Sequence, residues 1–140
     1  MLRKFLIALA LLGGGAAPAA ADDRLYQALG EQAGIRRLVV DFVDRLYLDA
    51  RLAPFFKDAS RKNLVEQLGD QFCSLAGGPC RYEGGAMRAV HRDMNIGKGD
   101  FNALVEALQD AMEASGIPFA TQNRLLALLA PMHRDIINKP

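Results

Sequence analysis

The sequence contains very little histidine, cysteine or tryptophan. Among its 140 residues there are two histidines, two cysteines and no tryptophan. Cys73 and Cys80 stand seven residues apart with no histidine close by, which makes a poor zinc site. We find neither a serine–histidine–acid pattern nor a phosphate-binding loop motif. The sequence therefore gives no support to a zinc-binding module, a serine hydrolase or a nucleoside triphosphatase.

Charge of one sign is also scarce. Residues 22–140 contain fifteen basic and sixteen acidic side chains, because Arg3 and Lys4 are the only charged residues before them, so their net charge is −1 with neutral histidines. A nearly neutral domain offers no electrostatic attraction for nucleic acid or for an anionic membrane. Both are therefore poor candidates for its partner.

The longest apolar run is confined to the first residues. The segment FLIALALLGGGAA follows a short basic lead and precedes PAAADD, with small residues at Ala19 and Ala21. This three-part layout is typical of a secretory signal peptide. We expect residues 1–21 to be a signal peptide cleaved after Ala21, and residues 22–140 to be one exported, periplasmic domain. A retained anchor is the alternative, although the run is short and rich in glycine for a membrane span.

Export changes the interpretation of the two cysteines. Disulfides persist in oxidising compartments, and a bridge between Cys73 and Cys80 would close an eight-residue segment. The chain-entropy model gives such a loop a stabilisation of roughly 2.5 kcal/mol. We favour the bridge; the alternative is two independent thiols, one in a helix and one in a loop.

Helical periodicity dominates the mature chain. A short helix is expected to end near Gly30, and longer ones are expected at residues 35–48, from Ser60 to Ala76, at residues 100–115, and from Pro118 onward. Apolar residues recur at helical spacing in the long segments, and no stretch alternates as a strand would. Ser60 is a suitable N-cap. The fold class predicted is all-α, with about four substantial helices and several short ones.

More than twenty residues between Ala76 and Asp100 carry only one short predicted helix, at residues 86–92. Long irregular segments in compact domains are commonly functional or disordered. This one places His91 among Met87, Val90 and Ile96. The histidine is either a core residue bonded to nearby carbonyl groups or a ligand for a metal or cofactor. A cofactor that fills space left by the missing helix explains the segment economically.

At these residues the sequence resembles the group I truncated haemoglobins. The matching pieces are LYQALG, VVDFVDRLYLDARLAPFF, LAGGP, Tyr82-x-Gly84, Met87-x-x-x-His91 and LLALLAPMHRDI, which occur in the family's order over essentially the whole mature chain. The resemblance implies a two-over-two helical sandwich around haem b. It also implies that a small diatomic ligand (O2, NO or CO) and an electron donor are the partners.

The resemblance also assigns roles to particular residues. His91 becomes the proximal iron ligand, Phe56 the ring stacked on the haem, and Leu64 and Leu68 part of the helix over the distal face. The remaining haem-pocket candidates are Phe72, Tyr82, Met87, Val90, Ile96 and Phe101. The candidates for the distal gas site are Val43, Tyr47, Gln67 and Gln71.

Two departures from the family pattern affect the expected function. The family often has a tyrosine at the position of Val43 and a glutamine near Leu68, and these groups hydrogen-bond the gas. Without them we expect faster oxygen release and easier oxidation of the iron. Tyr47, Gln67 or Gln71 could turn inward and replace the missing donor. For each residue alone, a polar tip at the surface is the simpler expectation.

The implied function is reversible binding of a diatomic gas at a pentacoordinate iron. Nitric oxide dioxygenation or peroxidase-like detoxification is the enzymatic alternative. The sequence also leaves open a copper site formed by His91, Met94 and Met87, and a cofactor-free helical interaction module. His133 is expected near the C-terminal end of the last helix, with covalent attachment to haem, as in some family members, as the alternative role.

Overall fold

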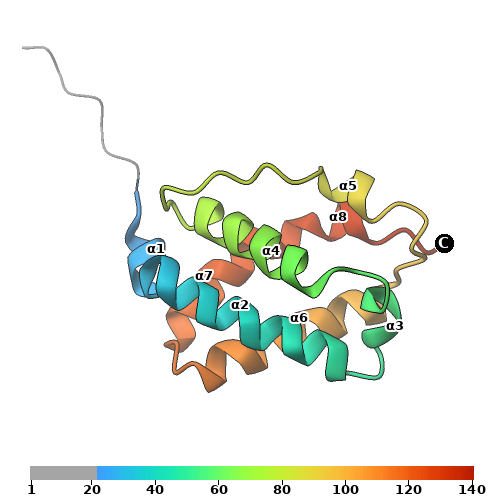
Figure 1. The fold of residues 1–140 in the computed structure, drawn as a ribbon, viewed down its shortest axis with the longest axis horizontal. Coiled ribbons are helices and arrows are strands. Elements are labelled where there is room, and N and C mark those ends of the chain that lie inside the picture. The colour runs from blue at the N-terminus through green and yellow to red at the C-terminus, as the bar shows by residue number, and fades with distance from the viewer. Residues whose placement is uncertain (1–21) are drawn as a thin grey trace, which may run out of the picture.

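The computed structural model describes residues 22–140, and the proposed signal peptide lies outside that range. The described chain is all-helical, as predicted (Figure 1). Its elements are α1 (Arg24–Ala28), α2 (Glu31–Leu48), α3 (Ala53–Phe56), α4 (Arg61–Leu75), α5 (Met87–Val90), α6 (Lys98–Ala114), α7 (Phe119–Leu129), the 3-10 turn η1 (Ala130–Met132) and α8 (His133–Ile136). Within residues 22–140, none of these helices combines the length and the apolar character needed to cross a membrane.

The four long helices, α2, α4, α6 and α7, pack against one another. Helix α2 packs against α4 and also against α6, while α7 packs against α6 and α4. The apolar stripe of α2 supplies the centre of the core, where Leu38, Val39 and Val43 are fully buried. The rings of Phe42 and Phe72 stack across the α2–α4 contact with centroids 6.3 Å apart. This is the two-over-two sandwich that the resemblance implies.

The helix ends follow local capping chemistry. The Ser60 hydroxyl accepts a hydrogen bond from the Asn63 amide at 3.2 Å and begins α4 as predicted. The Asp100 carboxylate accepts from the Gly97 amide at 2.8 Å and caps α6. Helix α2 begins four residues earlier than its apolar periodicity indicates, and helix α6 begins two residues earlier. The first turn of each helix carries mostly exposed residues, so the apolar pattern starts only after it.

The last predicted helix is interrupted. Helix α7 ends at Leu129, and η1 separates it from α8. Pro131 lies in η1 and has no backbone N–H, so it cannot continue the α-helical hydrogen-bond ladder. His133 is consequently the first residue of α8 and not the end of a long helix. Its ring is exposed and meets Phe101 edge-on, with centroids 6.3 Å apart.

The irregular segment predicted in the middle of the chain runs across one side of the molecule from α4 to α5 (Figure 1). Its beginning is fixed by a disulfide between Cys73 and Cys80, whose Cα atoms lie 5.7 Å apart. Gly77 has a φ of +85°. At Gly78 a Cβ would lie 2.7 Å from the Cys73 sulfur and 2.5 Å from the Tyr26 ring. The segment therefore leaves α4 through a turn that only small residues fit.

Candidate functional site

A largely apolar cavity of about 630 Å³ lies among the helices. It is bordered by side chains from α2, α3, α4, α5, α6, α7 and α8 and from the irregular segment. The structure brings all of the predicted haem-pocket residues to this cavity: Phe56, Leu64, Leu68, Phe72, Tyr82, Met87, Val90, His91, Ile96 and Phe101. Residues far apart in the sequence thus line the same cavity. Its volume lies within the usual range for cofactor sites.

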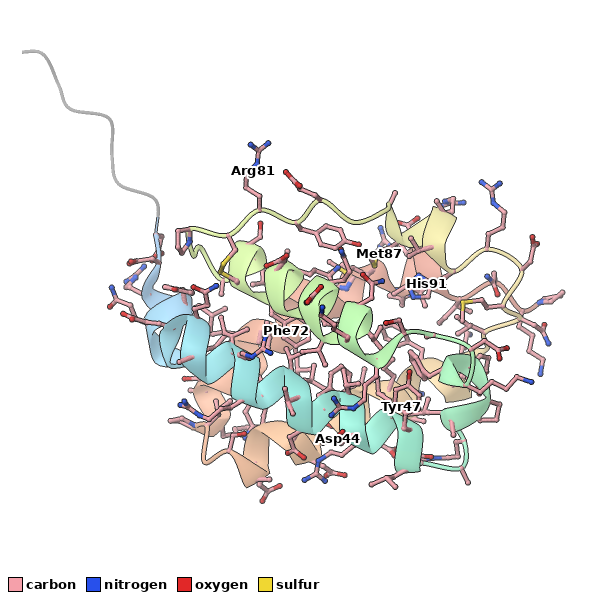
Figure 2. All side chains as sticks on the ribbon, in the orientation of Figure 1. Asp44, Tyr47, Phe72, Arg81, Met87 and His91 are labelled. Carbon is pink, nitrogen blue, oxygen red and sulfur yellow. A yellow bond between two sulfur atoms is a disulfide. The ribbon has the colours of Figure 1, made fainter. Side chains whose placement is uncertain are left out.

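His91 directly follows the four residues of α5 and lines the cavity (Figure 2). Its Nδ1 lies 2.7 Å from the carbonyl oxygen of Met87, one turn earlier. A carbonyl can only accept, so Nδ1 carries a hydrogen, and in the neutral imidazole Nε2 is then the nitrogen with the lone pair. A metal-binding histidine usually donates its other N–H to a carbonyl or carboxylate in this way. The two sequence interpretations of this histidine are therefore compatible, since one nitrogen bonds to a carbonyl and the other remains free for a ligand.

The residues present fit a haem group. Haem needs one axial nitrogen, apolar walls and enough space for the ring, and the cavity offers His91, aliphatic and aromatic walls, and adequate volume. In residues 22–140 there is no group of three or more histidine, cysteine, aspartate or glutamate side chains that could hold a bare metal ion. A copper ion bound by His91, Met87 and Met94 would leave most of the cavity unexplained. The cavity therefore favours a large apolar cofactor with one protein ligand.

Part of the wall provided by α4 and α2 is apolar. Leu64 and Leu68 line the cavity from α4, and Phe42 and Leu46 line it from α2. Val43 is fully buried but does not appear among the lining residues. Successive helix residues are turned by about 100°, so Val43 faces the helix-packing core, whereas Phe42 and Leu46 border the cavity. The expectation that Val43 overlooks the gas is therefore not met.

Tyr47 does not reach the cavity either. Its hydroxyl donates to the carbonyl oxygen of Ala59 at 3.0 Å, and its ring lies against Phe56 with centroids 6.3 Å apart. Figure 2 shows Tyr47 away from Met87 and His91. With its donor already used, Tyr47 holds the loop before α4 and supports Phe56. It is not the replacement for the missing tyrosine.

The two glutamines of α4 do line the cavity. Gln71 is only 7 % exposed, and its amide nitrogen lies 3.5 Å from the Met87 sulfur and 3.8 Å from the Met132 sulfur. The expectation of a surface tip is therefore wrong for Gln71. The Oε1 of Gln67 is buried without a hydrogen-bond partner among the described residues. Together with Asn63, which also lines the cavity, these amides are the polar groups that α4 offers to the site.

The irregular segment closes the cavity near Gln67. The Tyr82 hydroxyl donates to the carbonyl oxygen of Gly85 at 2.8 Å, and burial raises the pKa of Tyr82 above its ordinary value. At Gly84 a Cβ would lie 2.5 Å from both the Tyr82 ring and the Gln67 oxygen. Among the described lining residues, the ionisable side chains are His91, Tyr82 and Asp100, and the Asp100 carboxylate is occupied as a helix cap.

Sequence reasoning missed much of the far wall. The residues of α6 to α8 that line the cavity are Asp100, Phe101, Leu104, Val105, Leu108, Leu126, Leu129, Ala130, Met132 and Ile136. Of these, only Phe101 was predicted. Their helical spacing was visible, but an apolar stripe that packs on protein has the same pattern as one that packs on a cofactor. Leu52 and Phe55 of the α3 region were missed for the same reason.

Comparison with known proteins agrees with this geometry. The model of the bacterial-like globin family matches residues 24–138. Group 1 truncated haemoglobins of Nostoc sp. and Mycolicibacterium paratuberculosis are 30% and 29% identical to the chain, over 82% and 80% of its length and 98% and 82% of theirs. The crystal structure of the truncated haemoglobin of Tetrahymena pyriformis superimposes with a TM-score of 0.79 at 27% identity, covering 82% of this chain and 98% of that one. The chain therefore belongs to the bacterial-like globin family and is a group 1 truncated haemoglobin, a haem globin.

Proposed function

We propose that the protein reversibly binds a small diatomic gas, with dioxygen as the first candidate, at a pentacoordinate haem b iron held by His91. The observation that carries the proposal is the histidine at the cavity wall, whose Nδ1 is bonded to Met87 and whose Nε2 is free to bind a metal. When bound, the haem supplies an iron with an open coordination position for the gas. The protein supplies everything else that determines affinity.

The side chains around the cavity have separate tasks in this proposal. The carbonyl oxygen of Met87 fixes the tautomer and direction of the His91 ring and increases its basicity as a ligand. Phe56, Leu64 and Leu68 form an apolar wall that excludes water and binds an uncharged gas without strong polarisation. Gln67 and Gln71 of the same helix provide amide groups, and the Gln71 amide is already directed at two sulfur atoms.

Nitric oxide dioxygenation is the enzymatic alternative. Oxygen activation is helped by hydrogen-bond donors aimed at developing negative charge, whereas Val43 and Tyr47 provide no such donor in the cavity. We therefore favour gas binding over catalysis as the function. Rapid nitric oxide consumption in the presence of oxygen and a reductant would reverse that order.

An absorption spectrum of the purified protein with haemin supplied tests the central proposal. The unaltered chain is expected to show an intense near-ultraviolet band that shifts when carbon monoxide is added to the reduced protein. His91→Ala is expected to bind haemin more weakly and to lose the pentacoordinate ferrous spectrum, with recovery when imidazole is added. His133→Ala is the matched control, because His133 is exposed and outside the cavity lining. A colourless protein that refuses haemin would refute the proposal.

We also propose that the protein is exported to the periplasm. The disulfide between Cys73 and Cys80 supports this location, because structural disulfides persist in oxidising compartments and are rare in the bacterial cytosol.

A further inference from the structure

We propose that Asn138 is a positioning residue for His91, through which the C-terminal tail fixes the loop that carries the proximal histidine. The proposal rests on the proposed role of His91 as the iron ligand. Its evidence is a set of hydrogen bonds that connects two segments 47 residues apart in the sequence. Figure 1 shows α8 beside α5, with the tail continuing past the loop that follows α5.

The loop from His91 to Ile96 has little support of its own. Asp93 and Asn95 both adopt left-handed backbone conformations, with φ of 63° and 56°. Non-glycine residues rarely adopt such angles, although aspartate and asparagine tolerate them best. The one hydrogen bond within the loop, from the Met94 amide to the carbonyl oxygen of His91, is long at 3.3 Å. The loop therefore needs outside contacts to keep one conformation.

Asn138 supplies those contacts at both ends of the loop. Its Nδ2 donates to the carbonyl oxygen of His91 at 2.6 Å, and its Oδ1 accepts from the Ile96 amide at 2.8 Å. The backbone amides of Asn138 and Lys139 both donate to the carbonyl oxygen of Ile96, at 3.0 and 2.9 Å. An asparagine amide offers a donor and an acceptor on one rigid group, so a single side chain clamps both ends of the loop.

The clamp and Met87 hold different groups of the histidine. Met87 holds the ring through Nδ1, and Asn138 holds the backbone through the carbonyl group of the same residue. Helix α5 is only four residues long, which is too short to be stable without tertiary contacts. The other polar link between α5 and α8, from Arg88 to Asp135 at 2.8 Å, joins two largely exposed side chains and is expected to contribute little. Asn138 is therefore the principal polar restraint that the C-terminal tail places on the loop carrying His91, while Met87 holds the ring itself.

The test uses the full-length protein, haem-loaded and ferrous for two of the readouts and haem-free for the third. We compare the unaltered chain with Asn138→Ala and Asn138→Asp, and use Asn123→Ala as the control, because Asn123 is an exposed residue of α7. The readouts are the iron–histidine stretching band in the resonance Raman spectrum and the rate of haem transfer to an excess of a haem-accepting globin. A third readout is amide hydrogen exchange at Ile96 in the haem-free protein.

Asn138→Ala is expected to shift or broaden the iron–histidine band, to speed haem loss about 3- to 10-fold, and to speed exchange at Ile96, since each lost hydrogen bond is worth about that factor. Asn138→Asp keeps the acceptor for the Ile96 amide but loses the donor to His91. It should therefore retain slow exchange at Ile96 while still altering the band. Asn123→Ala should change none of the three.

A band and a haem-loss rate that are unchanged in both Asn138 variants would overturn the positioning role while leaving His91 as the ligand. Absence of an iron–histidine band in the unaltered protein would instead refute the proposed function, and the positioning role with it. If Asn138→Ala does not fold, Asn138→Asp decides the matter by the same band.

Discussion

At the scale of single residues, hydrogen bonding decides which side chains are available to a ligand. His91 lines the cavity, and Nε2 is the ring nitrogen left for a ligand because Met87 already accepts the hydrogen of Nδ1. Tyr47 carries the same kind of donor that the family uses at its gas site, but its hydroxyl is bonded to Ala59. The Gln71 amide contacts only thioether sulfurs, which are weak acceptors. The chemistry of each group therefore depends on partners that lie elsewhere in the chain.

The proposed gas binding leads to a prediction for Leu68, which lines the cavity from α4. Leu68→Gln places an amide donor in the site, and a hydrogen bond to a strongly polarised partner is worth about 1.5–3 kcal/mol. We expect oxygen to dissociate from the ferrous, haem-loaded variant roughly ten- to a hundredfold more slowly than from the unaltered protein. Stopped-flow measurement of oxygen dissociation checks this.

Leu68→Met is the control for that experiment, because it keeps the site apolar at similar volume and should leave the oxygen dissociation rate nearly unchanged. A slow rate in the unaltered protein, with no further slowing in Leu68→Gln, would contradict the prediction. It would indicate that Gln67 or Gln71 already donates to the gas.

At the scale of elements, α4 connects the cavity to the irregular segment. Its cavity face carries Leu64, Leu68 and Gln71, and near its C-terminal end Cys73 is joined to Cys80. The bridge holds the start of the segment that leads through Tyr82 to α5. The segment that leads to the short helix α5 is thus fixed at its start by the disulfide. The loop after α5, which begins at His91, is held by the C-terminal tail.

Opening the disulfide should lower the stability of the protein. In the chain-entropy model an eight-residue loop contributes roughly 2.5 kcal/mol, so Cys73→Ser/Cys80→Ser is expected to lose about that free energy of unfolding. Urea denaturation of both proteins, with and without reductant, measures the loss; the double variant should not respond to reductant.

Mature protein from the periplasm should begin at Asp22 and carry no alkylatable thiol. Free thiols and an intact residue 1 in that fraction would contradict both the bridge and the export.

At the scale of the whole molecule, the helices surround a space that protein atoms do not fill. The cavity of about 630 Å³ is lined mainly by apolar side chains, and all four long helices contribute to it. An apolar group placed there therefore adds contacts with every long helix. Ligands that bind only the folded state stabilise it according to their concentration and affinity. The fold and its cofactor are therefore expected to be thermodynamically coupled.

Removing haem should lower the melting temperature. At a free haem concentration of one hundred times Kd, the holoprotein gains about 2.7 kcal/mol over the haem-free chain. Thermal unfolding followed by far-ultraviolet circular dichroism, with haemin titrated into the haem-free protein, measures this as a rising midpoint. His91→Ala should need more haemin for the same rise. Identical midpoints with and without haemin would contradict the coupling.

Local sequence signals were sufficient for most of the fold. Periodicity placed the four long helices, and the Ser60 cap and the irregular middle were correctly located. The predicted pocket residues gather at one cavity because each lies on the apolar face of its helix or in the irregular segment. The break at η1 was missed although Pro131 signals it, because the apolar spacing continues through the proline. Val43 was expected at the cavity but faces the helix-packing core, because a family position does not specify the direction of a side chain. The Tyr47 hydroxyl bonds to Ala59 and does not turn inward, which is the simpler of the two expectations for it.

The sequence by itself determined the helical class, the family and the single histidine among apolar neighbours, since these depend on residue type and local spacing. Only the tertiary structure decided that Gln71 is buried against sulfur, that Tyr47 is bonded to Ala59, and that Asn138 holds both ends of the loop after His91. The physical reason is distance along the chain. A hydrogen bond between residues 12 to 61 positions apart leaves no periodic trace in the sequence, because it forms only after the helices have packed.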